Sequence, residues 1–192
     1  MSPTKTQLED PKVLFEGKYL RALAHGHWEF VSRKNASGVV IIVAVTPSGD
    51  MLFVEQFRPP VGRRVIELPA GLAGDHADKT GEPLSHAAIR ELEEETGWRA
   101  ARMEQLAEGP VSAGLTDETV TFFRAHELTS IGPGGGDEFE SIVVHQVPVA
   151  EVPSWLAECQ QGGALVDPKV FAALYFIREE RAALAPAERI GR

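Results

Sequence analysis

Hydrophobic residues along the chain gather in short runs that polar, glycine-containing stretches separate. The most continuous run is VVIIVAVT, residues 39–46, whose unbroken series of mostly β-branched residues predicts a strand that is buried on both faces. The turn-prone Ser48-Gly49-Asp50 follows, and then a second run at 51–57, so the two runs are expected to form a hairpin. The core of the main domain is therefore expected to begin at this first run.

Shorter runs predict further strands, and longer amphipathic segments predict helices. The predicted strands lie near Val13 and Phe15 and at 19–24, 28–32, 65–68, 102–107, 119–125 and 142–147, and the predicted helices at 83–96, 152–161 and 168–184. These elements alternate without a regular strand–helix–strand period, so the predicted class is α+β, a mixed β-sheet between helices. The polar break after Lys34 divides the chain into an N-terminal antiparallel sheet, 1–34, and a main domain, 35–192.

Composition and charge narrow the function classes. The chain has 192 residues and a formal net charge of -9, which excludes nucleic-acid binding through a broad basic surface, because neutralising phosphates needs clustered Lys and Arg. Cys159 is the only cysteine, so no intrachain disulfide can form and a reducing cytoplasm is expected. Without an apolar leader or a run of membrane-spanning length, neither secretion nor membrane insertion is expected.

The helix predicted at 83–96 contains the densest charge of the chain, in the stretch RELEEETG. Pro83 suits the start of a helix and Gly97 its end. Positions three or four apart share one helical face, which here consists of Leu84, Ala87, Ala88, Glu91, Glu94 and Glu95. Arg90 and Glu93 fall on the opposite side, where they are expected to face solvent.

An acidic run is most often a solvated helix face. In this helix, however, the three glutamates continue a stripe that elsewhere faces the core, and converging carboxylates repel one another unless a cation joins them. Hard divalent cations prefer oxygen ligands, and Mg²⁺ is usually held by a few carboxylates, waters and substrate phosphates. The helix therefore predicts a site for Mg²⁺ or Mn²⁺ and a substrate that carries phosphate.

The spacing of these residues resembles a known motif. Glu82, Arg90-Glu91-Leu92, Glu94-Glu95 and Gly97 resemble the Nudix box, Gx5Ex7REUxEExGU, in which U is a bulky apolar residue. Two positions depart from it, because the first glycine of the box falls on His76 and its last apolar position holds Trp98. Gly71 is then the equivalent glycine, followed by a loop about five residues longer, which a surface loop tolerates at small cost.

The resemblance extends over most of the chain. WEFVSR, VEQFRPPVGR, ELPAGL, SAGLTDE and GDEFES are similar, in that order, to segments of ADP-ribose and nucleoside diphosphate sugar pyrophosphatases. This resemblance implies a Nudix fold with an N-terminal sheet that helps to build a homodimer. It also implies hydrolysis of a diphosphate linkage to a nucleoside monophosphate and a sugar phosphate. Ser112-Ala113-Gly114 lacks the proline that the ADP-ribose subgroup usually has, so the preferred sugar stays open.

Site residues follow from the same resemblance. The metal ligands would be Glu91, Glu94 and Glu95, with Glu95 also counted as catalytic, together with the backbone carbonyl of Ala70. The catalytic base would come from the GPGGGDEFE loop, with Glu140 favoured and Glu138 the alternative. The substrate-binding candidates are Trp28 for the base ring, Glu29 and Arg33 beside it, Arg58 for the diphosphate, and Leu72.

Two other functions compete with this one. A Nudix-fold sensor would bind a nucleotide sugar without cleaving it, and such a protein is expected to lose glutamates of the box, all of which this chain retains. Hydrolysis of nucleoside triphosphates fits the box but not WEFVSR or the N-terminal sheet.

Overall fold

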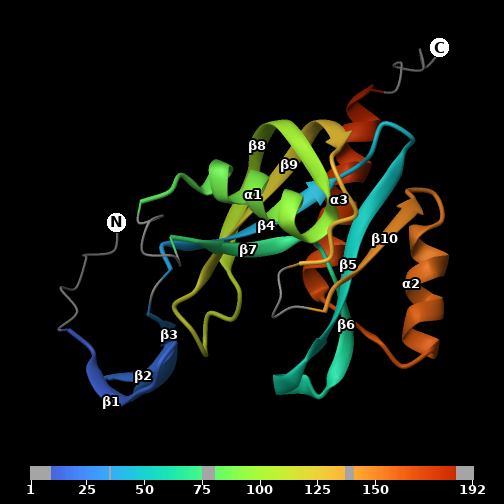
Figure 1. The fold of residues 1–192 in the computed structure, drawn as a ribbon. Helices are drawn as coiled ribbons and strands as arrows, with labels where there is room; N and C mark the ends of the chain where they lie inside the picture. Colours follow the sequence, from blue (N-terminus) through green and yellow to red (C-terminus); the bar gives the residue numbers. More distant parts are fainter. Residues whose placement is uncertain (1–9, 35, 75–80, 137–140, 185–192) are drawn as a thin grey trace, which may run out of the picture.

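The structure is a computed structural model of the chain, and it describes residues 10–34, 36–74, 81–136 and 141–184. A small N-terminal sheet stands beside a larger body, which contains two further sheets and the helices (Figure 1). The small sheet comprises β1 (Lys12–Glu16), β2 (Leu20–His25) and β3 (Trp28–Arg33), paired antiparallel in that order. This confirms the antiparallel sheet predicted for the N-terminal part.

The first sheet of the body has the order β7-β4-β9-β8. Its members are β4 (Gly38–Ala44), β7 (Ala70–Ala73), β8 (Trp98–Pro110) and β9 (Thr119–Ser130). Only β4 and β9 run parallel within it, and the other pairs are antiparallel. Because β4 is central and residues 40–44 are fully buried, the prediction of a strand covered on both faces is confirmed.

The second sheet of the body has the order β10-β5-β6-β11. Its members are β5 (Asp50–Arg58), β6 (Arg63–Glu67), β10 (Val143–Pro148) and the short β11 (Leu165–Val166), and the 3-10 helix η1 (Pro59–Val61) joins β5 to β6. β11 runs parallel to β6, whereas the other pairs are antiparallel. The mixed sheet expected from the sequence is therefore built as two mixed sheets.

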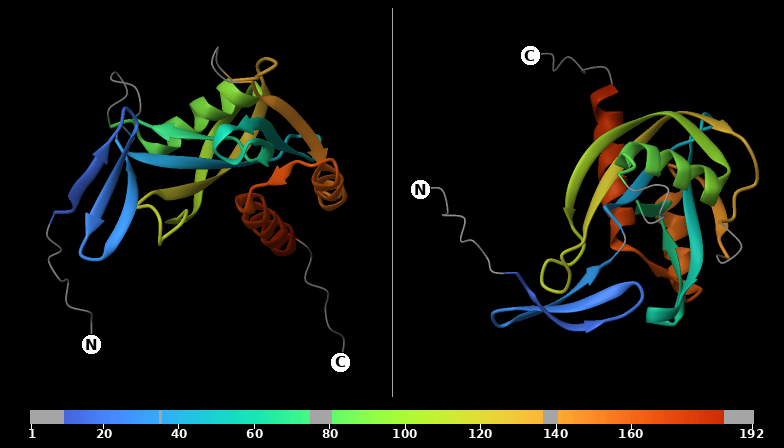
Figure 2. Two further views of the ribbon diagram at one scale, coloured as in Figure 1. Left: turned by 90° about the horizontal axis from the view of Figure 1, so that it is seen from below. Right: turned by 60° about the vertical axis from the view of Figure 1, so that its left-hand side comes forward.

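Side-chain alternation along β4 divides the hydrophobic core between its two faces. Val40 and Ile42 pack on one side with Leu92 of α1 (Leu84–Thr96). Ile41 and Val43 pack on the other side against a larger cluster, which includes Met51, Phe53 and Ile66 of the second sheet, Val152 and Leu156 of α2 (Val152–Gln161), and Val170, Ala173 and Ile177 of α3 (Pro168–Leu184). The left view of Figure 2 shows α1 on one side of the first sheet and α2 and α3 on the other.

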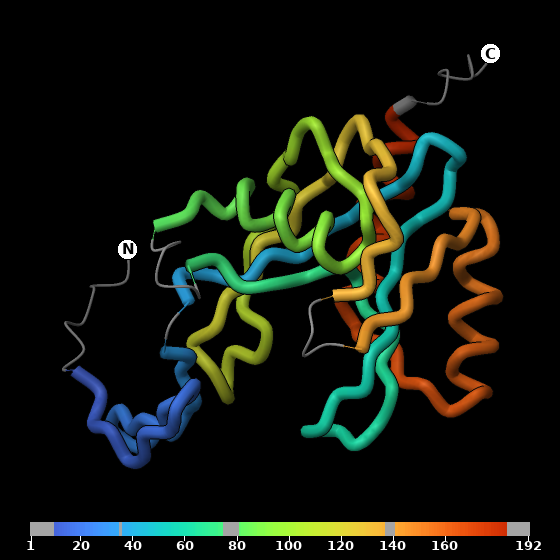
Figure 3. Tube along the Cα trace, viewed as in Figure 1, coloured from blue at the N-terminus to red at the C-terminus, as the bar shows by residue number. Residues whose placement is uncertain are grey.

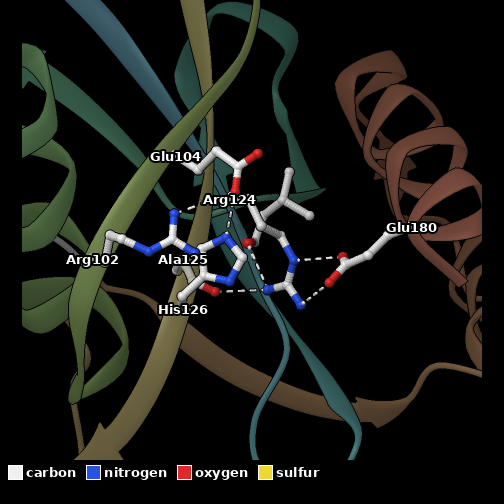
Figure 4. A network of polar contacts seen from close by, with 7 residues as sticks. Arg102, Glu104, Arg124, Ala125, His126 and Glu180 are labelled. Atoms are coloured by element: carbon white, nitrogen blue, oxygen red, sulfur yellow. Dashed lines mark hydrogen bonds and ion pairs between the residues drawn. The ribbon is translucent and has the colours of Figure 1, made fainter. Parts of the chain in front are cut away.

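Arg124 links the first sheet to α3 (Figure 4). Its guanidinium donates from Nε to Glu180 of α3 over 2.8 Å and from Nη1 to the carbonyl of Ala125 over 2.7 Å. Beside it, His126 and Arg102 both contact the carboxylate of Glu104, at 2.9 and 3.3 Å. The Arg124 side chain is only 13% exposed and that of Glu180 is 38% exposed, so this link is partly buried.

The predicted hairpin of residues 39–57 is wrong. The turn at Ser48-Gly49-Asp50 forms, but β4 and β5 belong to different sheets and pair only through an isolated bridge between Val45 and Met51. Each strand finds its partners elsewhere along the chain, and local turn chemistry cannot indicate such partners.

Other strand predictions were incomplete. β7 and β11 were not predicted, β8 is longer than expected at both ends, and β9 is longer than expected at its C-terminal end. The helix bounds agree with the prediction, and Gly97 ends α1 in the left-handed conformation (φ 70°).

Candidate functional site

A cavity of about 420 Å³ is lined by strands of both sheets of the body, by α1 and by the start of α3. It is lined by Arg33, Val39, Ile41, Gln56, Arg58, Glu67, Ala70, Gly71, Leu72, Arg90, Glu91, Glu94, Glu95, Val111, Glu118, Val120 and Lys169. Among these described residues are five carboxylates and four cationic side chains. The charges are balanced closely enough that a diphosphate would need additional positive charge to bind.

The last turns of α1 supply the acidic wall of this cavity. Glu95 is only 3% exposed, and its Oε2 accepts a hydrogen bond from the backbone N–H of Ala70 over 2.9 Å. The carboxylate of Glu91 lies directly against the backbone of Gly71, where an added Cβ would stand 1.9 Å from Glu91 Cδ. Only glycine fits at that position, so the ELPAGL segment and the helix are shaped to bring these carboxylates to one wall.

Arg90 lies among these carboxylates. Its Nη1 donates to Glu91 over 2.7 Å and to Glu94 over 3.0 Å, and its Nη2 donates to the carbonyl of Leu72 over 3.0 Å and to Glu82 over 3.3 Å. Burial by itself would lower the pKa of Arg90, but its hydrogen bond to Glu82 and the charges of Glu91 and Glu94 outweigh burial, so the pKa is raised. Arg90 is therefore cationic at every physiological pH.

The prediction that Arg90 faces solvent is wrong, because its side chain is only 16% exposed. The helical wheel places its Cα away from the three-glutamate stripe, but a long side chain can lie across its i+1 and i+4 neighbours. Glu93, also expected to face solvent, has a side chain that is only 22% exposed and pairs with Arg99 at 2.6 Å, and it does not line the cavity. The face of α1 that was predicted to point inward also differs from the buried face. Leu92, which was not assigned to that face, is buried, whereas Glu94, which was, has a half-exposed side chain.

The acidic wall suits a divalent cation by the chemistry of its donors. Glu91, Glu94 and Glu95 offer only carboxylate oxygens, and those of Glu91 and Glu94 already bind one guanidinium, so the wall already attracts positive charge. As placed, no three of the His, Cys, Asp and Glu residues in the described parts of the chain are grouped tightly enough to hold a metal ion. Arg90 bridges two of the carboxylates in this arrangement, and a metal would need them to turn toward it.

The second sheet and the start of α3 also line the cavity. Arg58 is held by Glu67 through bonds of 2.8 and 3.3 Å, and Gln56, on the same strand, is buried. Lys169 pairs with Asp167 at the beginning of α3. Of these lining residues only Arg58 was predicted from the sequence. Gln56 and Glu67 lie within VEQFRPPVGR and ELPAGL, so the resemblance of these segments also indicates their positions.

The remaining substrate-binding candidates separate in space. Arg33 and Leu72 line the cavity with Arg58, as does Ala70, the predicted backbone ligand of the metal, and Arg33 pairs with Glu118 at 2.7 Å. Trp28 does not line it. Its side chain is 56% exposed and borders a separate hollow of about 530 Å³, which is lined by Asp10, Pro11, His25, Trp28, Phe30, Ala113, Gly114, Thr116 and Asp117. Glu29 is exposed and lines neither hollow.

Glu138 and Glu140, the two candidates for the catalytic base, lie outside the described residues. Among the helices that the structure describes, none is both long and apolar enough to cross a membrane.

Comparison with known proteins gives consistent matches. The NUDIX domain family matches residues 34–164. An ADP-ribose pyrophosphatase of Bacillus subtilis (strain 168) is 40% identical over 92 residues, which cover 48% of this chain and 47% of that protein. A methanol dehydrogenase activator of Bacillus methanolicus is 30% identical over 146 residues, covering 76% of this chain and 74% of that protein. The chain thus spans about half the length of the first of these relatives.

A solved structure shares the fold. The crystal structure of an ADP compounds hydrolase superposes with a TM-score of 0.66 over 93% of this chain and 97% of that chain. At 18% sequence identity the likeness concerns the fold alone. Because the family match covers residues 34–164, well over half of the chain, this protein belongs to the NUDIX domain family.

Proposed function

We propose that this protein hydrolyses the diphosphate linkage of a nucleoside diphosphate sugar, and that ADP-ribose is the first substrate to test. The products would be a nucleoside monophosphate and a sugar phosphate. The observation that carries the proposal is that the carboxylates of Glu91, Glu94 and Glu95 and the guanidinium of Arg58 line one and the same cavity. A relative with 40% identity over 92 residues is named for the same reaction class.

Nudix hydrolases generally depend on a divalent metal. In this chain Glu91, Glu94, Glu95 and the carbonyl of Ala70 would hold it, as Mg²⁺ or Mn²⁺. Such an ion, when bound, neutralises phosphate charge and lowers the pKa of a coordinated water. Glu95 is held in place by the N–H of Ala70, which also fixes the acidic wall against β7. The number of ions stays open.

Arg58 would hold the diphosphate. A guanidinium presents a planar fork of donors that matches phosphate oxygens, and Glu67 orients this one by two hydrogen bonds. Arg33, which also lines the cavity, donates one hydrogen bond from Nε to Glu118 over 2.7 Å. Glu140, with Glu138 as the alternative, would accept the proton of the attacking water. The roles of Arg58 and Arg33 are supported by their positions in the cavity, and those of Glu140 and Glu138 by their positions in the sequence.

The N-terminal sheet, in the proposed subdomain 1–34, would bind the nucleoside base and form a homodimer. Trp28 borders an apolar hollow outside the cavity, and a flat indole can stack on a base ring. Because Trp28 lines a different hollow from Arg58 and Glu95, a second copy of the chain could complete a site that one chain leaves divided. Cytoplasmic location stays a prediction.

The substrate is tested by incubating the protein with Mg²⁺ and, separately, ADP-ribose, other ADP-sugars, GDP-mannose and UDP-sugars, and by separating the products chromatographically. Release of a nucleoside monophosphate and a sugar phosphate in equal amounts is the expected result. Saturable binding of a nucleotide sugar without release of monophosphate would instead identify a sensor. Faster hydrolysis of nucleoside triphosphates than of any nucleotide sugar would show that nucleoside triphosphates are the substrates.

A further inference from the structure

A glycine-rich segment encloses the C-terminal end of α1, where two of the proposed metal ligands lie. The backbone N–H of Gly135 donates to the carbonyl of Glu95 over 2.8 Å, and that of Gly136 donates to the carbonyl of Glu94 over 3.1 Å. We call Gly134, Gly135 and Gly136 the glycine clamp. In Figure 3 the chain after β9 passes beside the end of α1, in agreement with these bonds.

The clamp needs glycine for close approach. Gly134 has a φ of 68°, and an added Cβ would lie 2.3 Å from the carbonyl carbon of Thr96 and 2.6 Å from the oxygen of Glu95. On the helix side, a Cβ on Gly97 would lie 2.1 Å from the oxygen of Gly132. Backbone therefore packs directly on backbone at this contact, which a side chain at either position would push apart.

These bonds supply partners that α1 itself cannot supply. Gly97 already caps α1, since its N–H donates to the carbonyl of Glu93, and Thr96 Oγ1 donates to the carbonyl of Leu92. The last carbonyls of a helix lack partners within the helix and can be left to water. Here the clamp binds the two carbonyls that belong to Glu94 and Glu95, and the Glu95 side chain is held at its far end by Ala70.

We infer that the glycine clamp positions Glu94 and Glu95 for metal binding. It is a positioning device, because it contacts the backbone of the ligand residues and not their carboxylates. Groups that hold metal ligands in place commonly affect metal affinity about 10- to 100-fold. The inference rests on the metal dependence in the proposed function, but it concerns binding of the ion and not hydrolysis.

The test measures Mn²⁺ binding to the full chain without nucleotide, by electron paramagnetic resonance of the free ion. Gly134→Ala is expected to weaken binding about tenfold. Gly132→Ala is the matched control, because an added Cβ there meets nothing within 4 Å, and this variant should bind as the wild type does. With substrate, the activity lost by Gly134→Ala should return at excess metal. Equal Mn²⁺ affinity in all three proteins, or no binding by the wild type, would overturn the inference.

A second measurement needs no variant and so does not depend on how Gly134→Ala folds. Hydrogen exchange at the amides of Gly135 and Gly136 is followed with and without Mg²⁺ in the wild-type protein. Slower exchange on adding Mg²⁺ is expected, because the ion would stabilise the residues whose carbonyls accept these N–H groups. Unchanged exchange at saturating Mg²⁺ would overturn the inference that the glycine clamp positions the metal ligands, even if the protein hydrolyses ADP-ribose. Conversely, a protein that binds Mn²⁺ as expected but hydrolyses no nucleotide sugar loses only the proposed function.

Discussion

Glu94 and Glu95 are adjacent in the sequence but differ greatly in their surroundings. The Glu94 side chain is 50% exposed, whereas Glu95 is 3% exposed and is the only charged residue classed as buried in the described part of the chain. Burying a carboxylate is costly unless hydrogen bonds compensate, and the N–H of Ala70 provides one. A cost of this kind is retained more readily at a functional site than at a structural one.

Replacing Glu95 tests its role directly. Glu95→Gln should lower the turnover number for a nucleotide sugar by roughly a hundredfold or more, the general scale for losing a key charge stabiliser. Steady-state kinetics at saturating Mg²⁺ measure it. Glu93→Gln is the control, since Glu93 pairs with Arg99 outside the cavity, and it should stay within about twofold of wild type. Near-normal turnover of Glu95→Gln would contradict the assignment of Glu95 as a metal ligand.

The proposed base can be located by comparing two variants. Glu140→Gln should reduce the turnover number more than Glu138→Gln does, while the Michaelis constant changes little, because a proton acceptor acts mainly in the transition state. Both variants are compared under the same conditions with ADP-ribose. If Glu138→Gln proves the more damaging, the base is Glu138.

At the scale of elements, α1 was predictable and the strand partners were not. The helix has a start signal, a stop signal and a 3.6-residue pattern in thirteen residues, all of them local. The pairing of β4 with β9, about eighty positions apart, depends on contacts that no local pattern encodes. α3 likewise reaches its place on the first sheet partly through Arg124, whose partner Glu180 lies on a distant helix.

Arg124 should therefore matter for stability and not for catalysis. Arg124→Leu removes the bonds to Glu180 and to the carbonyls of Val43 and Ala125, and should lower the free energy of unfolding by about 2 kcal/mol. Arg102→Leu, at a side chain that is 55% exposed, should cost less than about 1 kcal/mol. Urea denaturation of both variants measures the difference, and equal losses would show that the link to α3 contributes little.

For the whole molecule, the N-terminal sheet leaves several large apolar side chains exposed. Large hydrophobic side chains there are 44% to 66% exposed, namely Val13, Leu14, Phe15, Tyr19, Leu20 and Trp28. An apolar patch of this kind on a folded chain commonly marks an interface. The surface therefore supports the homodimer that the resemblance implies, although the structure contains one chain.

The dimer is checked by light scattering in solution. The wild type should have about twice the 20.9 kDa mass of one chain. Phe15→Lys, at a position 66% exposed on β1, should shift the mass toward one chain, whereas Phe171→Lys, at an exposed position on α3, should not. A wild-type monomer at working concentration, or a dimer insensitive to Phe15→Lys, would count against an interface through this sheet.

The sequence by itself determined the α+β class, the three helices, the buried central strand and the acidic residues of α1. These features depend on side-chain periodicity, on capping residues and on spacing within a single helix, and such signals act over a few residues. The substrate-binding candidates Arg33 and Arg58 were also identified from the sequence, and both line the cavity.

Only the tertiary structure decided how these pieces meet. It assigned β4 and β5 to separate sheets, turned Arg90 toward Glu91 and Glu94, separated Trp28 from the cavity, and placed the glycine clamp against the end of α1. Each outcome depends on contacts between residues that are distant in the chain or on the reach of a long side chain. RELEEETG therefore indicated the chemistry, and the packing of β7 and the glycine clamp around the helix set where its carboxylates lie.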